Sequence, residues 1–260
     1  SIKILFLPSG FGMYGLNRMV LATGGIYFLM KAESDYDEEK LYAKYQPDIC
    51  SKHVYDRRMK EADLRRELQE VWGEIGFFNL PHRMGSNEQV QKCLEKSRKG
   101  RLYCTKRSEQ LLDLMHNSQP MGNNWTRWIA HADVTVAELL RYKFMLGQYH
   151  EALKREWAKH GRTVPKPKDR EKYRGAHFVI RRGRAPEDFV GPAQAKREYE
   201  QARQRIQLVI DRHRDTPWER LGHRMKRGIF PWRCSWRKIP WPKKNEPGPS
   251  GGPSPPSLSF

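Results

Sequence analysis

The chain has 260 residues, of which 38% are hydrophobic and 30% are charged, so we expect several small cores rather than one large one. Its 49 lysines and arginines outnumber the 30 acidic residues, and the formal net charge is +19. This excess makes an anionic partner plausible (nucleic acid, an acidic protein or a membrane surface), and the plainer alternative is the solvated surface of a basic protein. No apolar run approaches the roughly 20 residues that span a bilayer. No signal peptide is visible, which leaves the compartment undetermined.

The first 31 residues predict a strand–helix–strand unit. Apolar runs at 2–7 and 26–30 have the length of buried strands, and the turn at 8–12 leads into a short amphipathic helix that ends near Gly24. Two parallel strands cannot bury both of their faces alone. We therefore expect the rest of the sheet, and the native N-terminus, to lie before Ser1.

Gly10, Gly12 and Gly15 fit the spacing G-x-G-x-x-G between that strand and that helix, with Glu33 or Asp35 as the acidic residue that a dinucleotide site requires. The helix is short, however, and no second half of a dinucleotide-binding sheet follows. A tight turn that lets the helix pack closely is the favoured interpretation.

The middle of the chain predicts short helices. Leu64, Leu68, Val71 and Trp72 have helical spacing. Further along, Ser86 and Gln89 form a capping box for a helix that Gly100 would end, and Ser108 would cap the next one. We expect the remainder of 73–131 to consist of short elements and turns.

The C-terminal half predicts a helical hairpin. Thr135 and Glu138 form a capping box for a helix over 135–160, and Pro192 suits the first turn of a helix over 193–213. We expect these two helices to pack antiparallel. Thr216 and Pro217 would begin a short helix that folds back on the second. The Pro-, Gly- and Ser-rich tail, 243–260, predicts disorder.

The four cysteines are too few for a disulfide scaffold. Cys50 and His53 have the spacing of a zinc-ligand pair, which Cys93 and Cys104 would complete, but these two lie further apart than usual. We therefore favour burial of Cys93 as a small hydrophobic residue.

No catalytic motif stands out. The patterns G-x-S-x-G, H-E-x-x-H and G-x-x-x-x-G-K-[ST] do not occur, and nine histidines are scattered along the chain. His213 and His223 flank the Thr-Pro-Trp turn, where packing explains them as well as catalysis does. The sequence therefore predicts a non-enzymatic protein.

Two basic segments, 154–184 and 215–246, are candidates for binding phosphates, and their tryptophans for stacking on unpaired bases. The favoured alternative is that the tryptophans dock the last segment onto the helices while the cations face water. The candidate nucleic-acid-binding residues are Lys166, Lys168, Arg170, Lys172, Arg174, Arg181, Arg182, Arg184, Arg233, Trp236, Arg237 and Lys238.

Several stretches resemble a known family. The segment "LPSGFGMYGLNRMVLATGGIYFL" resembles the C-terminal edge of a von Willebrand factor type A (VWA) domain from large bacterial proteins. The connector "YQPDICSKHVYDRRM", the helix with "RYKFMLGQYHEAL" and the stretch "AKREYEQARQRIQLVIDRHRDTPWERLGHRMKRGIFPW" resemble, in that order, the region C-terminal to this domain in the same proteins.

The resemblance implies a strand–helix–strand remnant of a doubly wound α/β sheet (1–31), a connector with short helices (32–131), a mostly α-helical extension (132–242) and the tail. Many VWA domains bind Mg²⁺ or another divalent cation through Asp-x-Ser-x-Ser, which is absent from this chain and would lie upstream. The resemblance implies a scaffold or protein-interaction role. A nucleic-acid-binding module is the alternative.

Overall fold

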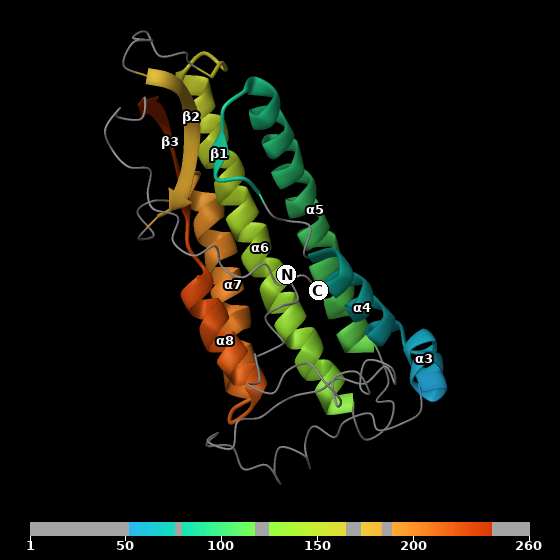
Figure 1. Ribbon diagram of the computed structural model, residues 1–260. Helices are drawn as coiled ribbons and strands as arrows, with labels where there is room; N and C mark the ends of the chain where they lie inside the picture. The colour runs from blue at the N-terminus through green and yellow to red at the C-terminus, as the bar shows by residue number, and fades with distance from the viewer. Residues whose placement is uncertain (1–51, 76–79, 118–124, 165–172, 184–188, 241–260) are drawn as a thin grey trace, which may run out of the picture.

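The structure is a computed structural model that describes residues 52–75, 80–117, 125–164, 173–183 and 189–240. This part is mostly helical, as predicted for the extension, and carries one small antiparallel sheet (Figure 1). The elements in chain order are α3 (Lys52–Glu61), α4 (Asp63–Ile75), β1 (Arg83–Met84), α5 (Asn87–Asn117), α6 (Trp125–Lys159), β2 (Tyr173–Arg182), α7 (Pro192–Arg212), α8 (Pro217–Gly228) and β3 (Trp232–Pro240).

Several predictions fall outside the described residues. These are the strand–helix–strand unit with its glycine-rich turn, the connector up to Cys50, and the tail over 243–260. They stay predictions.

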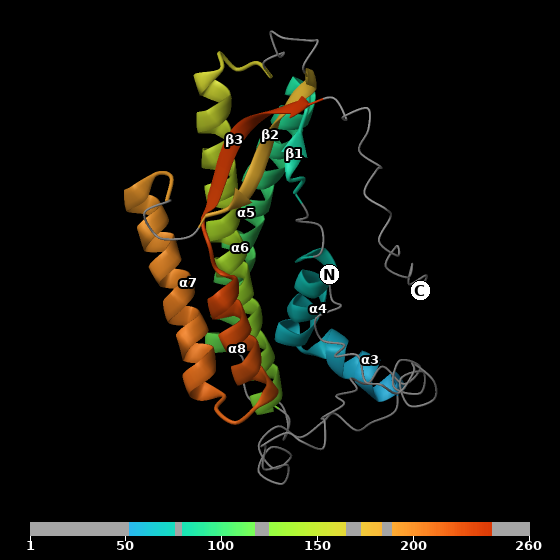
Figure 2. The ribbon, with the colours of Figure 1, turned by 60° about the vertical axis from the view of Figure 1, so that its left-hand side comes forward.

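Two long antiparallel helices, α5 and α6, form the axis of the molecule (Figures 1 and 2). On one side α7 runs antiparallel to α6, and α8 returns along α7, as the sequence predicted for this hairpin. On the other side α4 packs against α5 and α6. Helix α6 therefore lies between two layers.

Helix α6 supplies more of the main core than any other described helix. Its side chains Val136, Leu139 and Phe144 are fully buried, and they pack in one cluster with Leu64 and Leu68 of α4. Each such burial contributes on the order of 2 kcal/mol. A helix surrounded on several sides needs apolar residues around most of its circumference, which matches the composition of α6.

The α7–α8 pair closes against α6 through a second cluster. Ile206, Val209 and Ile210 of α7 pack there with Trp218 and Met225 of α8.

Helices α7 and α8 approach each other closely at Gly222. A Cβ atom at that position would lie 2.6 Å from Cγ1 of Ile210. Only glycine allows the two helices to come this close.

Polar side chains also link the layers. Arg107 of α5 donates to both carboxylate oxygens of Glu67 of α4, at 2.7 and 2.9 Å. Arg101 of α5 pairs with Glu198 of α7 across α6. This second pair passes over Gly147, where a Cβ would meet both partner side chains at 3.4 Å.

The helix boundaries confirm some sequence predictions. Ser86 precedes α5, and its Oγ accepts the Gln89 N–H at 3.2 Å, while Gln89 Oε1 accepts the Gly85 N–H at 2.8 Å. Pro192 lies at the N-terminus of α7, and Pro217 follows the N-cap residue Thr216 of α8. The Thr216 hydroxyl makes no N-cap bond and instead donates to the His213 carbonyl.

Other boundary predictions are wrong. Helix α5 runs through both Gly100 and Ser108, and the Ser108 hydroxyl donates to the Thr105 carbonyl at 2.9 Å. Helix α6 already begins at Trp125, so Thr135 is an interior residue. The capping-box pattern misled because a buried interior serine or threonine can satisfy its hydroxyl within the helix.

The three strands lie in the order β1-β2-β3, and both pairs are antiparallel. Phe178 and Ile180 of β2 are buried against Tyr149 and Leu153 of α6. The Tyr149 hydroxyl donates to the Pro81 carbonyl at 2.8 Å and so anchors the chain just before β1. One face of the sheet therefore packs on α6, as Figure 2 shows.

Candidate functional site

The two basic segments singled out in the sequence meet in one sheet. Strand β2 comes from the first segment and β3 from the second, and they pair along their whole length. The sequence predicted neither strand: it marked both stretches as basic segments, with docking of the last segment by its tryptophans as the favoured alternative. Of the candidate residues, Arg174, Arg181, Arg182, Arg233, Trp236, Arg237 and Lys238 belong to these strands, whereas Lys166, Lys168, Arg170, Lys172 and Arg184 lie outside the described residues.

The register sorts the side chains of the sheet onto two faces. Arg181 lies directly opposite Arg233, and His177 lies opposite Arg237. Arg83 of β1 lies opposite Val179 of β2. Paired residues in an antiparallel sheet share a face. The face turned away from α6, here called the outer face, therefore carries Arg83, His177, Val179, Arg181, Arg233, Ser235 and Arg237.

The outer face is strongly cationic. All four of its arginines are exposed, and His177 is half-buried among them. None of the residues assigned to the three strands is Asp or Glu. Burial, followed by the charges of Arg83 and Arg237, lowers the pKa of His177.

The aromatic side chains of β3 point the other way. Trp232 and Trp236 pack against the cluster of Phe178, Ile180 and Tyr149 under the sheet. The ring of Trp236 lies 5.8 Å from the ring of His160, between centroids. These tryptophans therefore attach β3 to the helices, which is the docking role considered in the sequence.

Two further cations of the sheet, Arg182 and Lys238, lie next to aromatic rings and not on the outer face. The Arg182 guanidinium lies 4.2 Å from the centroid of Phe230, and the Lys238 ammonium lies 5.8 Å from the ring centroid of Trp236. Cation–π contacts of this kind contribute roughly 0.5–1 kcal/mol at exposed sites. Arg182 and Lys238 thus belong to the rim of the sheet.

A buried charge cluster joins α6 to α7. Asp133 is fully buried, accepts a hydrogen bond from Arg205 at 2.6 Å and lies 3.0 Å from Nε2 of His213. Arg212 lies 3.6 Å from the same carboxylate. Sequence reasoning missed Asp133 because nothing in the local pattern marks it. With its carboxylate enclosed by cations, the cluster fits a structural role.

Two cysteines of the described part, Cys93 and Cys104, are buried in different clusters, and Cys234 is half-buried. Cys93 lies in the cluster under the sheet, and Cys104 lies in the main core. Burial raises the pKa of the Cys104 thiol to about 12. Within the described part of the chain, no three His, Cys, Asp or Glu side chains come together as a metal site would require.

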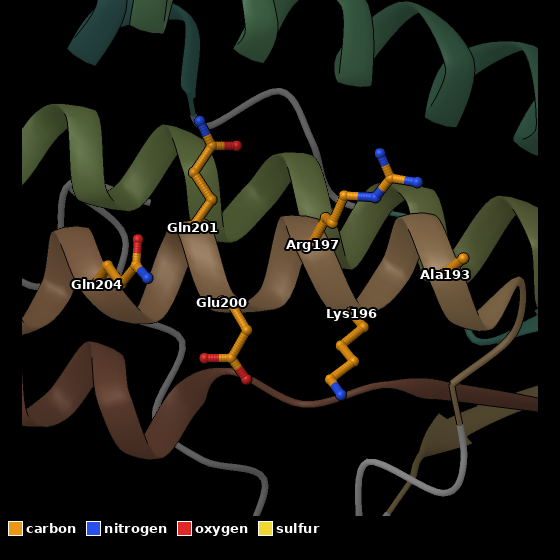
Figure 3. A pocket seen from close by; sticks show the side chains of 6 residues that line it. All are labelled: Ala193, Lys196, Arg197, Glu200, Gln201 and Gln204. Atoms are coloured by element: carbon orange, nitrogen blue, oxygen red, sulfur yellow. The ribbon is translucent and has the colours of Figure 1, made fainter.

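A shallow hollow on α7 is lined by Ala193, Lys196, Arg197, Glu200, Gln201 and Gln204. Figure 3 shows that these side chains point in different directions from one helix. They do not converge on a common point, so the hollow has no defined chemistry.

Comparison with known proteins gave no match: no family model fits the sequence, and no curated protein or solved structure is similar enough to be counted. Among the residues that the structure describes, no helix combines the length and apolar character needed to cross a membrane. The outer face, defined by the strand register and by its four arginines, is the candidate site.

Proposed function

We propose that this chain is a non-enzymatic interaction module whose helical bundle is a scaffold that presents the outer face to an anionic partner. The observation that carries the proposal is the register of β2 and β3, which sets Arg181 directly opposite Arg233. Two segments separated by about fifty residues of sequence are thereby brought together with the same charge.

Like charges directly opposite each other destabilise a sheet. A cross-strand position is where an opposite charge would stabilise most easily, yet the three strands hold only cations among their charged residues. An array of this kind attracts anions and speeds their association. The opposed cations therefore cost the sheet stability and create a positive potential at its surface. A binding function explains this arrangement, and a merely solvated surface does not.

We propose further that the module is the C-terminal part of a VWA-like protein. The support is the resemblance of 7–29 and of the stretch around Thr216 and Trp218 to that family. A scaffold that brings a partner to such a domain is the role that this parentage suggests. The outer face then restricts the partner to one with an anionic surface.

The test uses heparin, a polyanion without bases, and isothermal titration calorimetry. The variant R181Q/R233Q removes two charges from the outer face, and the control K106Q/R224Q removes two charges from exposed positions on α5 and α8. We expect the first variant to lose most of its affinity and the control to keep it. Equal losses in both variants would show that only net charge matters, which contradicts the proposal.

A further inference from the structure

We infer that the partner of the outer face is duplex nucleic acid, contacted through its phosphates. The inference rests on the proposed function and names the class of partner that this face fits. It is independent of the parent protein.

The cations of the outer face are of the type that suits phosphate. The outer face holds four arginines and no lysine. Arginine presents a planar fork of donors that matches phosphate oxygens two at a time, whereas lysine acts as a point charge. The hydroxyl of Ser235, in the middle of the array, adds a donor of the kind that contacts phosphates.

The placement of the apolar and aromatic side chains favours nucleic acid over an acidic protein as the partner. Protein interfaces concentrate their binding energy in aromatic and apolar anchors near the centre of the patch. On the described sheet, Trp232 and Trp236 are turned inward and pack on the helices, and Val179, although it belongs to the outer face, is only 6% exposed. Interfaces with nucleic acid are more polar and far more positive, as this face is.

The lack of Phe, Tyr and Trp side chains among the residues assigned to the outer face favours a duplex over a single strand. Proteins bind single strands by stacking bases on exposed aromatic rings. The tryptophans of β3 pack against the core. The outer face therefore offers contacts only to the sugar-phosphate backbone of a nucleic acid. A duplex presents its phosphates in a fixed array and needs no stacking platform.

The dimensions agree with a duplex groove. One end of the array is the pair Arg181 and Arg233, and the other is the pair His177 and Arg237. Four residues along a strand at about 3.3 Å each separate the ends by about 13 Å. The major groove is about 12 Å wide. The two ends can therefore reach phosphates on opposite sides of one groove.

The experiment measures fluorescence anisotropy of the full chain with three labelled probes: a 20-base-pair duplex, a 20-nucleotide single strand and poly-glutamate. Salt is varied from 50 to 300 mM. Four phosphate contacts predict a slope of about −3.6 in log K against log salt, and R181Q/R233Q should reduce it by about 1.8. If the variant and the wild type bind equally well at 1 M salt, this change in slope corresponds to a roughly 60-fold loss of affinity at 100 mM salt. The control K106Q/R224Q should keep the original slope, and R83Q/R237Q serves as a second test pair if the first fails to fold.

The outcomes separate the two proposals. Duplex bound at least as tightly as the single strand, and more tightly than poly-glutamate, supports the inference. If the single strand or poly-glutamate binds more tightly than the duplex, and R181Q/R233Q weakens that binding, the duplex assignment is overturned and the proposed function is kept. Binding of every probe that is insensitive to R181Q/R233Q overturns both.

Discussion

Replacing Arg181 by glutamate should make the protein more stable and a worse binder at the same time. Arg181 lies opposite Arg233, and directly opposed side chains have Cβ atoms about 5 Å apart. Two unit charges about 6 Å apart in water interact by about 0.7 kcal/mol. The substitution converts that repulsion into an attraction, a gain of about 1.4 kcal/mol at low salt. With a Debye length of about 8 Å at physiological ionic strength, about half of this gain remains.

Urea unfolding followed by circular dichroism measures the effect. Arg181→Gln should give about half of the gain of Arg181→Glu, and the gain should shrink as salt is added. In the background of Arg233→Gln the gain should nearly vanish, because the introduced glutamate has lost its partner. Two results would show that the two arginines do not face each other and that the outer face is wrongly assigned. One is that Arg181→Glu is less stable than Arg181→Gln. The other is that the gain in stability from Arg181→Glu is the same in the wild-type and Arg233→Gln backgrounds.

Three further predictions concern the scaffold. Gly222→Ala should lower the free energy of unfolding by about 1–3 kcal/mol, since its Cβ would lie 2.6 Å from Ile210 Cγ1. If urea unfolding shows a loss of less than a few tenths of a kcal/mol, the close approach of α7 and α8 is contradicted. Asp133→Asn should lower the free energy of unfolding by about 3–5 kcal/mol, because Arg205 and His213 lose the charge of a buried partner, and an unchanged unfolding midpoint would refute this. Burial, followed by the charge of Arg127, lowers the pKa of His131 to about 4. The unfolded chain therefore binds this proton more readily, and stability should be complete above about pH 6.5 and fall toward pH 4. His131→Asn should flatten that part of the pH profile, and an identical profile in the variant would count against it.

The helical elements with strong periodicity and distinct ends were predictable from sequence. Helix α7, with its apolar stripe and Pro192, and helix α8, behind Thr216 and Pro217, are found where the pattern placed them. Helices α5 and α6 were predicted too short, because Gly100 and Thr135 look like boundaries in isolation. Their local preference is overridden by burial between packed layers, which a single sequence does not reveal.

The sheet, and with it the candidate site, was not predicted. Strand β3 does carry the period-2 signal of a strand, because Trp232, Cys234 and Trp236 alternate with Arg233, Ser235 and Arg237, but the segment was interpreted through its charges and tryptophans instead. In β2 the signal is weaker, because Phe178, Val179 and Ile180 are consecutive apolar residues. The pairing of β2 and β3 joins segments distant in sequence, so the juxtaposition of Arg181 and Arg233 appears only in three dimensions. Composition did indicate a basic surface, and the register shows which of those cations share one face.

Locating the bound partner tests most directly whether the outer face is the binding surface. The photo-crosslinking residue p-benzoylphenylalanine is introduced in place of Ser235, at the middle of the outer face, and in a control in place of Lys106 on α5. Each protein is irradiated with labelled duplex at 100 mM salt, and crosslinked complex is quantified. We expect efficient crosslinking from position 235 and little from 106. Equal yields from both positions, or a higher yield from 106, would contradict binding at the outer face.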